Sequence, residues 1–234
     1  MKNYRIESVI LAVGLALLGL CVYWGLCGLA QRDREVSVRG LAEREVMADH
    51  VIWPIVYKTT GNDLQALYDD INTANNKIVS FLKRNGVKAD EINVGAPQII
   101  DLRADRYNER QSERDRYNVT STLTVSTSQV ETVRGLIPRM GELLREGVAI
   151  SAQEYGMTPQ YEFQSLNKIK PEMIEEATKN AREAAEKFAK DSESSLGKIK
   201  NATQGLFSIE DRDQFTPYIK KIRVVTSVDY YLKS

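Results

Sequence analysis

The chain has 234 residues, and its 32 lysine and arginine side chains equal its 32 aspartates and glutamates in number. These charges are interspersed, which argues against a nucleic-acid groove, because such a groove needs clustered positive charge. Both cysteines, Cys21 and Cys27, lie in an apolar run near the N-terminus. Residues 28–234 therefore hold neither a disulfide scaffold nor a thiolate metal cage.

The N-terminal segment is predicted to enter a membrane. Residues 8–30 contain no charged side chain, and as a helix they are long enough to span a hydrocarbon core of ~30 Å. Tyr23 and Trp24 lie toward the far end of this run, where amphipathic aromatic rings favour the membrane interface. We expect residues 1–30 to be a membrane anchor or signal segment and residues 31–234 to be one exported domain.

A cleaved signal peptide is the alternative to an uncleaved anchor. Gly28-Leu29-Ala30 resembles a small-x-small cleavage site, but the apolar run is longer than the ~7–15 residues of a usual signal h-region. This length favours the uncleaved anchor. Under either interpretation the body of the chain is exported.

Two strands are predicted within residues 34–61. Val36 and Val38 alternate with polar neighbours, which is the pattern of a half-buried strand. Residues 51–57 form a continuous apolar run, as in a strand covered on both faces. Because proline cannot donate to a β-ladder, we expect Pro54 to lie at an edge position or a bulge.

Residues 62–86 predict an amphipathic helix. Asn62 or Asp63 can cap its start, and Gly86 can close it in the left-handed conformation. Its apolar stripe recurs at the helical period and comprises Leu64, Leu67, Tyr68, Ile71, Ala74, Ile78, Phe81 and Leu82.

Strands are expected next at residues 91–103 and 116–127, the second of them rich in β-branched side chains. Residues 104–116 between them are charged and lack an apolar period, which is typical of a solvated hairpin loop.

A second helix is predicted over residues 128–147. Ser128 and Glu131 have the spacing of a capping box, Pro138 should kink the helix, and Gly147 should end it. Its expected buried stripe comprises Val130, Val133, Leu136, Ile137, Met140, Leu143 and Leu144.

Residues 153–166 are predicted to form a strand that is irregular near Gly156 and Pro159. A third helix should begin near Pro171, with Gly197 as its stop signal. The small residues of its stripe suggest that the helix approaches a sheet closely; the stripe comprises Ile174, Ala177, Ala181, Ala184 and Phe188.

The last predicted elements are two strands, at residues 199–209 and 219–232, which are joined by a turn at residues 210–218. Runs of antiparallel strands with helices laid against them give an α+β fold. The prediction is one or more antiparallel sheets with three amphipathic helices packed on them, preceded by one N-terminal transmembrane helix.

Four stretches of sequence carry a family resemblance through their order and spacing. They are VSVRGLAEREVMADHV, NNKIVSFLKRNGVKADEINV, YNVTSTLTVSTSQVETVRGLI and ATKNAREAAEKFAKDSESSLGKI. Together they resemble the SIMPL domain (DUF541) family, which includes the bacterial periplasmic immunogenic protein, over about residues 35–232. The chain departs from the family pattern at Ala48-Asp49 and at Trp53-Pro54. The resemblance implies an exported bacterial envelope protein linked to stress tolerance, with no agreed enzymatic activity and with homo-oligomerisation.

No catalytic, cofactor or metal site is predicted. His50 is the only histidine, and Asp49 beside it points to the opposite face of a strand, so a structural or surface role is expected. Asp69 and Asp70 diverge in direction on their helix, which indicates a solvated face rather than an acid pair. The sequence has no nucleophile elbow, phosphate-binding glycine loop or zinc signature.

We therefore predict a single-pass, non-enzymatic protein of the bacterial inner membrane, with its C-terminal domain in the periplasm or outside the cell. It would act in the envelope by homo-oligomerisation or by binding an envelope protein, and it would contribute to stress tolerance. We expect no nucleic-acid partner. Residues 104–116 and the second helix are candidate contact surfaces. The alternative is a hydrolase or small-ligand-binding periplasmic module, which a deep pocket with convergent polar groups would favour.

Overall fold

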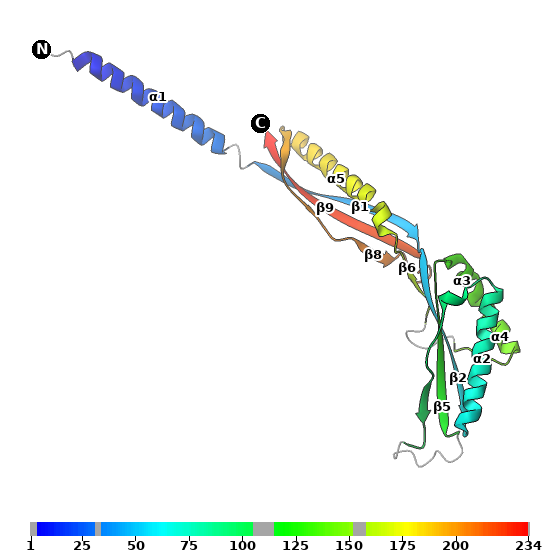
Figure 1. The fold of residues 1–234 in the computed structure, drawn as a ribbon. Helices are drawn as coiled ribbons and strands as arrows, with labels where there is room; N and C mark the ends of the chain where they lie inside the picture. Colours follow the sequence, from blue (N-terminus) through cyan, green and yellow to red (C-terminus); the bar gives the residue numbers. More distant parts are fainter. Residues whose placement is uncertain (1–3, 31–33, 105–114, 152–157, 234) are drawn as a thin grey trace. The chain divides into compact units, whose positions relative to one another are not determined.

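The computed structural model describes residues 4–30, 34–104, 115–151 and 158–233 (Figure 1). Helices accompany two antiparallel sheets, so the predicted α+β class is confirmed. The first element, α1 (Tyr4–Ala30), contains the apolar span Ser8–Gly25, which has a mean hydropathy of 2.1 and is long enough to cross a membrane. A membrane anchor and a signal sequence both have this property.

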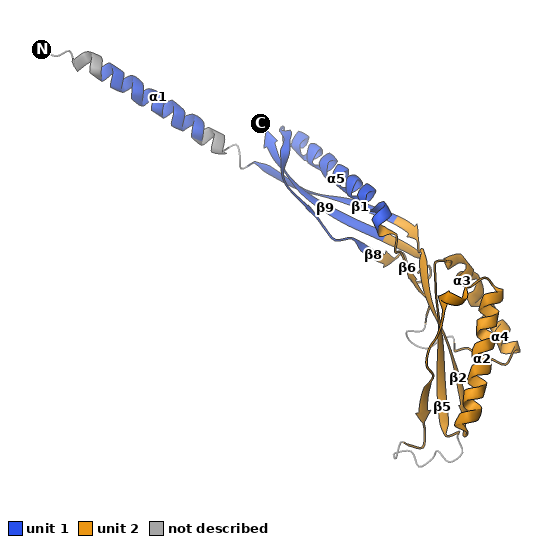
Figure 2. Cartoon of the chain, viewed as in Figure 1, with its two compact units in different colours: residues 1–44, 167–208, 222–234 blue, residues 45–166, 209–221 orange. Residues whose placement is uncertain are grey.

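The contacts divide the chain into two compact units (Figure 2). Unit 1 comprises residues 1–44, 167–208 and 222–234, and unit 2 comprises residues 45–166 and 209–221. Each unit has its own sheet and its own buried apolar cluster.

Unit 1 is built on a sheet with the strand order β1 (Glu35–Met47), β9 (Ile219–Lys233), β7 (Ser195–Gln204). Strands from opposite ends of the body are therefore neighbours. Buried residues alternate along β1 and β9, so one face of the sheet is packed and the other is exposed. Helix α5 (Leu166–Asp191) covers the packed face (Figure 1).

Helix α5 approaches β1 closely. Its buried residues recur at helical spacing and are Met173, Ala177, Ala181, Ala185 and Ala189. A Cβ atom built on Gly40 would lie 1.8 Å from the Ala177 carbonyl oxygen and 2.4 Å from the Ala181 nitrogen. Only glycine fits at residue 40, so the predicted close approach of a small-residue helix to a sheet is confirmed.

Unit 2 is built on a sheet with the strand order β3 (Ile92–Val94), β5 (Tyr117–Thr127), β2 (His50–Gly61), β6 (Gln160–Glu162). Strand β4 (Gln98–Asp101) also pairs with β5. Strands β2 and β5 form a continuous antiparallel ladder from the Val51–Thr127 pair to the Gly61–Tyr117 pair. Most of β8 (Ser208–Asp211) and the first residues of β9 also belong to this unit.

The helices of unit 2 are α2 (Leu64–Arg84), α3 (Val130–Leu136) and α4 (Gly141–Arg145), with the short helices η2 (Ala89–Glu91) and η3 (Ile137–Met140). The Asp63 carboxylate caps α2 by accepting from the backbone N–H groups of residues 65 and 66, as predicted. Gly86 and Gly147 have positive φ angles of 97° and 82°, so both predicted helix ends are confirmed. Pro138 lies in η3, where the predicted kink is a full break between α3 and α4.

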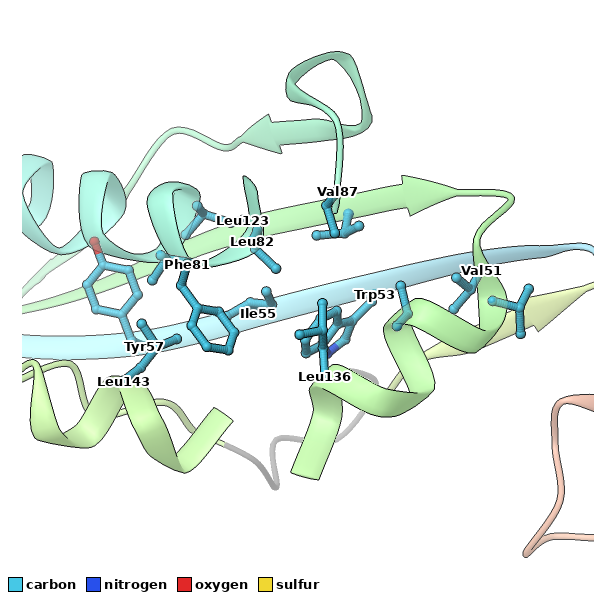
Figure 3. Packing of buried hydrophobic residues seen from close by; sticks show 14 of the residues in the cluster. Val51, Trp53, Ile55, Tyr57, Phe81, Leu82, Val87, Leu123, Leu136 and Leu143 are labelled. Atoms are coloured by element: carbon cyan, nitrogen blue, oxygen red, sulfur yellow. The ribbon is translucent and has the colours of Figure 1, made fainter. Parts of the chain in front are cut away.

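The core of unit 2 lies between the sheet and these helices (Figure 3). Alternate residues of β2 point into it, namely Val51, Trp53, Ile55 and Tyr57. They lie among apolar side chains of the helices and β5, which include Phe81, Leu82, Leu123, Leu136 and Leu143. The predicted helical stripes therefore form one core with the buried strand.

Three predicted strands are wrong in extent. Residues 91–103 form η2, β3 and β4 rather than one strand, because the break contains Pro97, which has no N–H to donate. Residues 199–209 are divided between β7 and β8, with Gly205 at the break. Of the strand predicted at residues 153–166, only β6 is present among the described residues, and residues 152–157 lie outside them.

Helix ends were also mispredicted. Helix α5 begins at Leu166 rather than near Pro171, and it ends at Asp191, where Glu193 takes the left-handed conformation with φ 53°. Gly197 is not the stop, because it lies inside β7. The predicted Ser128 capping box is absent, since Gln129 is the N-cap of α3 and makes no capping side-chain bond. Four residues of the predicted stripes are exposed: Leu64, Tyr68, Leu144 and Phe188.

Candidate functional site

Strand β2 of unit 2 has two differently paired edges. One edge pairs with β5 along almost the whole strand. On the other edge, β6 pairs with residues 50–52, and the Val56 carbonyl accepts a hydrogen bond from the Ser151 N–H at 2.7 Å. Between these points on this second edge, no described strand pairs with Trp53, Pro54 and Ile55, and residues 152–157 lie outside the described residues.

Pro54 lies at the centre of this interval. Backbone groups of successive strand residues point to opposite edges, so Pro54 directs its backbone to the same edge as Val56. A proline there leaves no N–H without an acceptor. Pro54 therefore lies on the side of β2 that faces away from β5, within a strand that is interior to the sheet.

A cavity of about 320 Å³ opens beside this interval, and we call it the β2-edge cavity. Its described lining comes from three consecutive residues of β2 and from the helices opposite: Trp53, Pro54, Ile55, Ile137, Met140, Gly141 and Leu144. Short connecting segments complete the described lining with Ile150, Ser151, Thr158 and Pro159. These side chains are apolar or carry a single hydroxyl, and none is charged.

Gly141 contributes empty space to the β2-edge cavity. It opens α4 with φ −59° and ψ −19°, a conformation that any residue adopts. A Cβ atom built there would meet no atom within 4 Å. Neither backbone conformation nor steric contact therefore requires glycine at this position, and a side chain there would project into open volume.

A second, more polar cavity of about 800 Å³ adjoins the first. The two share Ile137, Thr158 and Pro159 in their linings. The Arg134 guanidinium carbon lies 3.5 Å from the ring centroid of Tyr218, and Tyr161 meets Tyr218 edge to face at 6.1 Å. The wall is therefore a stack of planar groups, in which cation–π contact holds the guanidinium on the ring.

The cations of the polar cavity are already paired. Arg134 donates two hydrogen bonds to the Glu131 carboxylate, at 2.7 and 2.9 Å. The buried Lys220 donates to Asp211. Because both positive charges are neutralised locally, this cavity offers polar and planar contacts rather than a strong anion site.

The turn after β8 is held by Asp213. The Asp213 carboxylate accepts from the N–H groups of Phe215 and Thr216, each at 2.8 Å, and from the Thr216 hydroxyl and the Arg212 guanidinium. The hydroxyl of Thr216 and the guanidinium of Arg212 lower the pKa of Asp213 to about 2. This turn supplies Phe215 and Tyr218 to the lining of the polar cavity.

Asp49 and His50 have structural contacts, as expected for His50. The Asp49 carboxylate accepts from the N–H groups of Gln164 and Ser165, at 2.7 and 2.9 Å, and so holds the segment after β6. Burial raises the pKa of Asp49, but these hydrogen bonds outweigh it and lower the pKa overall. The His50 Nε2 atom lies 2.9 Å from the Ser126 hydroxyl on β5.

The remaining predicted positions do not converge on these cavities. Asp69 and Asp70 are exposed on α2, as expected. Most of the predicted contact loop at residues 104–116 lies outside the described residues. Among the residues that the structure describes, no three His, Cys, Asp or Glu side chains gather in a group that could hold a metal ion.

One polar network was not foreseen from the sequence. The Tyr57 hydroxyl lies 3.0 Å from the Ile71 carbonyl oxygen and 2.9 Å from Asn75 Oδ1, so these two acceptors share its one proton. The Ser121 hydroxyl lies 3.4 Å from the same Asn75 oxygen. Burial raises the pKa of Tyr57. The network ties α2 to β2 and β5, so the helix asparagine is structural.

The chain was compared with models of protein families and with curated proteins. A family model described as "SIMPL: Protein of unknown function (DUF541)" matches residues 36–221. The comparison with curated proteins found no match. The matched span includes both cavities and begins after the apolar helix α1. Because the family model covers most of the chain, this protein belongs to the SIMPL (DUF541) family.

Proposed function

We propose that this protein is a bacterial envelope protein, anchored in the inner membrane by residues 8–30, whose SIMPL body lies in the periplasm and acts by binding rather than by catalysis. The observation that carries the proposal is the uncharged span Ser8–Gly25 on the N-terminal side of a SIMPL body that begins at residue 36. A helix of this length and composition partitions into a bilayer. We place its action in envelope stress tolerance, as the family resemblance implies.

Membrane fractionation of the full chain with tags at both ends tests the anchor. We expect both tags on one polypeptide that stays in the membrane pellet after alkaline extraction, and a body that external protease digests in spheroplasts. A double substitution, Leu15→Arg with Leu18→Arg, should release the protein from the pellet, because two charges in the apolar span oppose insertion.

The matched control is Leu206→Arg, at a side chain in the body that is 95% exposed. This variant should fractionate like the parent. A soluble body that has lost its N-terminal tag would instead establish a cleaved signal peptide and refute the anchor.

We also propose that the body self-associates. Support comes from exposed apolar side chains in unit 1, Phe188 on α5 and Leu206 between β7 and β8. The β7 edge is a poor site for strand pairing, because two register shifts and the lysines 198 and 200 interrupt it. Light scattering on the solubilised full chain tests this proposal, and a strict monomer across concentrations would refute it.

A second candidate function, small-ligand binding, is favoured by the β2-edge cavity. Its apolar lining, with two hydroxyl side chains and a polar cavity alongside, has the composition of a small-molecule pocket. Its volume is at the lower end for such pockets. Binding of apolar probes to the full chain, read from Trp53 fluorescence, tests this function.

A further inference from the structure

We propose that the β2-edge cavity binds a single fatty acyl chain, with the polar end of the ligand directed toward the polar cavity. The inference rests on the proposed ligand-binding function and is independent of the membrane anchor. It concerns unit 2 alone, because both cavities are lined within that unit.

The lining selects an apolar ligand. Trp53, Ile55 and Ile137 form apolar walls, and the described lining contains no charged side chain. The apolar walls give a water molecule few polar partners, so hydrocarbon displaces water from beside them. Each methylene group transferred into such a space contributes about 0.8 kcal/mol.

The size of the cavity suits a chain of modest length. Its volume of about 320 Å³ is at the lower end for small-molecule pockets, so an acyl chain of medium length is the ligand to test.

Gly141 supports a ligand-filled rather than a packed cavity. A core packed by its own side chains leaves few voids, and glycine inside or at the start of a helix costs stability relative to alanine. At Gly141 neither φ nor a close neighbour demands glycine. Gly141 lines the same cavity as Trp53, so a larger side chain there would compete with a ligand for its space.

The shared lining of the two cavities orients the ligand. Thr158 and Pro159 line both spaces, so the polar cavity begins where the apolar one ends. There the Arg134–Tyr218 stack and the Thr158 hydroxyl offer contacts to a polar end group. Since Arg134 and Lys220 are paired with carboxylates, the ligand gains its affinity from the tail more than from the charge of its head.

Trp53 provides the readout, because it lines the cavity and the chain contains only one other tryptophan, Trp24 in α1. The full chain with Trp24→Phe is placed in phosphatidylcholine nanodiscs, and 11-bromoundecanoate is added as a heavy-atom quencher. We expect saturable quenching of Trp53 fluorescence that undecanoate reverses by competition. In a second arm, brominated acyl chains in the nanodisc lipid replace the free acid, which distinguishes a membrane lipid from a free fatty acid as the source.

The matched variants are Gly141→Leu and Gly135→Leu. Both residues lie in helices and have no atom within 4 Å of a built Cβ, but only Gly141 lines the cavity. We expect Gly141→Leu to weaken quencher binding by at least about tenfold, and Gly135→Leu to leave it unchanged. Circular dichroism establishes that both variants are folded; if Gly141→Leu is not, Gly141→Ala replaces it with a smaller expected loss.

The inference is overturned if neither quencher acts on Trp53, or if Gly141→Leu and Gly135→Leu bind alike. A third probe, 6-bromo-2-naphthol, separates this failure from that of ligand binding in general. Quenching by the naphthol alone, sensitive to Gly141→Leu, would refute the acyl chain and retain the ligand-binding function. The fractionation result is unaffected by any of these outcomes.

Discussion

Asp213 is the residue whose ionisation most directly shapes the candidate site. Its carboxylate accepts from two backbone N–H groups, a hydroxyl and a guanidinium within one short turn. All of these partners favour the charged carboxylate over the neutral acid. The conformation of the turn that lines the polar cavity is therefore coupled to pH.

The sign of this coupling follows from the pKa of Asp213, which is about 2 in the folded protein and about 3.9 in an unfolded chain. The stabilisation is fully present above about pH 4 and is lost as pH falls toward 2. Asp213→Asn keeps an amide oxygen as acceptor but removes the charge. We expect its urea midpoint to lie below that of the parent at pH 7 and to converge on it near pH 2.

The control for this titration is Asp69→Asn, at an exposed residue of α2. Its midpoint should follow that of the parent over the same pH range. If the difference between parent and Asp213→Asn is the same at pH 7 and pH 2, the carboxylate charge does not stabilise the turn.

At the scale of elements, the packing of α5 on β1 depends on one missing methyl group. A Cβ at residue 40 would overlap the backbone of α5, and a helix backbone cannot move aside as a flexible side chain can. We predict that Gly40→Ala destabilises unit 1 by about 2 kcal/mol or more, measured by urea unfolding of the solubilised full chain.

Gly135→Ala is the matched control for Gly40→Ala. Gly135 is exposed in α3 and has open space at its Cβ position. Alanine there should be neutral or stabilising by up to about 1 kcal/mol, because glycine has the lower helix propensity. Equal stability of Gly40→Ala and the parent would contradict the close contact.

The two expected N-caps of unit 2 differ in the structure, and this difference is measurable. The Asp63 carboxylate accepts from two N–H groups at the start of α2, whereas Ser128 makes no capping bond to α3. Asp63→Ala should cost about 1 kcal/mol in the free energy of unfolding, and Ser128→Ala should cost almost nothing. The reverse order would show that the capping box forms in solution.

The contrast between these caps shows what the sequence predicts and what it does not. Local patterns specified the stripes of the helices, the Asp63 cap and the glycine ends at residues 86 and 147. Where two neighbouring residues fit the same local pattern, the sequence does not show which of them takes the role. The Thr127 hydroxyl accepts from the Gln129 N–H, which starts α3 one residue later than the Ser128 pattern indicated.

The candidate site was less predictable than the fold, because a cavity is a property of packing between distant segments. The β2-edge cavity joins residues 53–55 to residues 137–144 and to 150–151 and 158–159. No periodic pattern in the sequence identifies residues that packing brings together from such distant segments. The one usable signal was Trp53-Pro54, an unpairable residue in the middle of an apolar strand, which indicated the edge but not the space beside it.

At the scale of the whole molecule, the two units differ in how far apart their strands lie in the sequence. In unit 1, β9 lies between β1 and β7, so the centre of this sheet comes from the last residues of the chain. Directly before β1, the Arg34 carbonyl accepts a hydrogen bond from the Leu232 N–H at 2.9 Å. In unit 2, the main ladder joins β2 to β5, and its helices lie in the same continuous segment, residues 45–166.

This arrangement predicts different responses to truncation. A chain that stops after Lys221 keeps all of unit 2 but loses residues 222–234, the part of β9 that belongs to unit 1. Without it, β1 and β7 have no strand between them, and their backbone groups lose their partners. Hydrogen exchange of the solubilised truncated chain should show fast exchange in β1 and β7 and preserved protection in β2, β5 and α2.

The full-length chain in the same detergent provides the reference for each peptide. Loss of protection in β2 and β5 as well would mean that unit 2 cannot hold its fold without unit 1. Retained protection in β1 would mean that its amides are bonded independently of β9. The expected pattern requires unit 2 to be stable on its own core, whose main cluster is larger than the one described for unit 1 and joins a sheet to three helices.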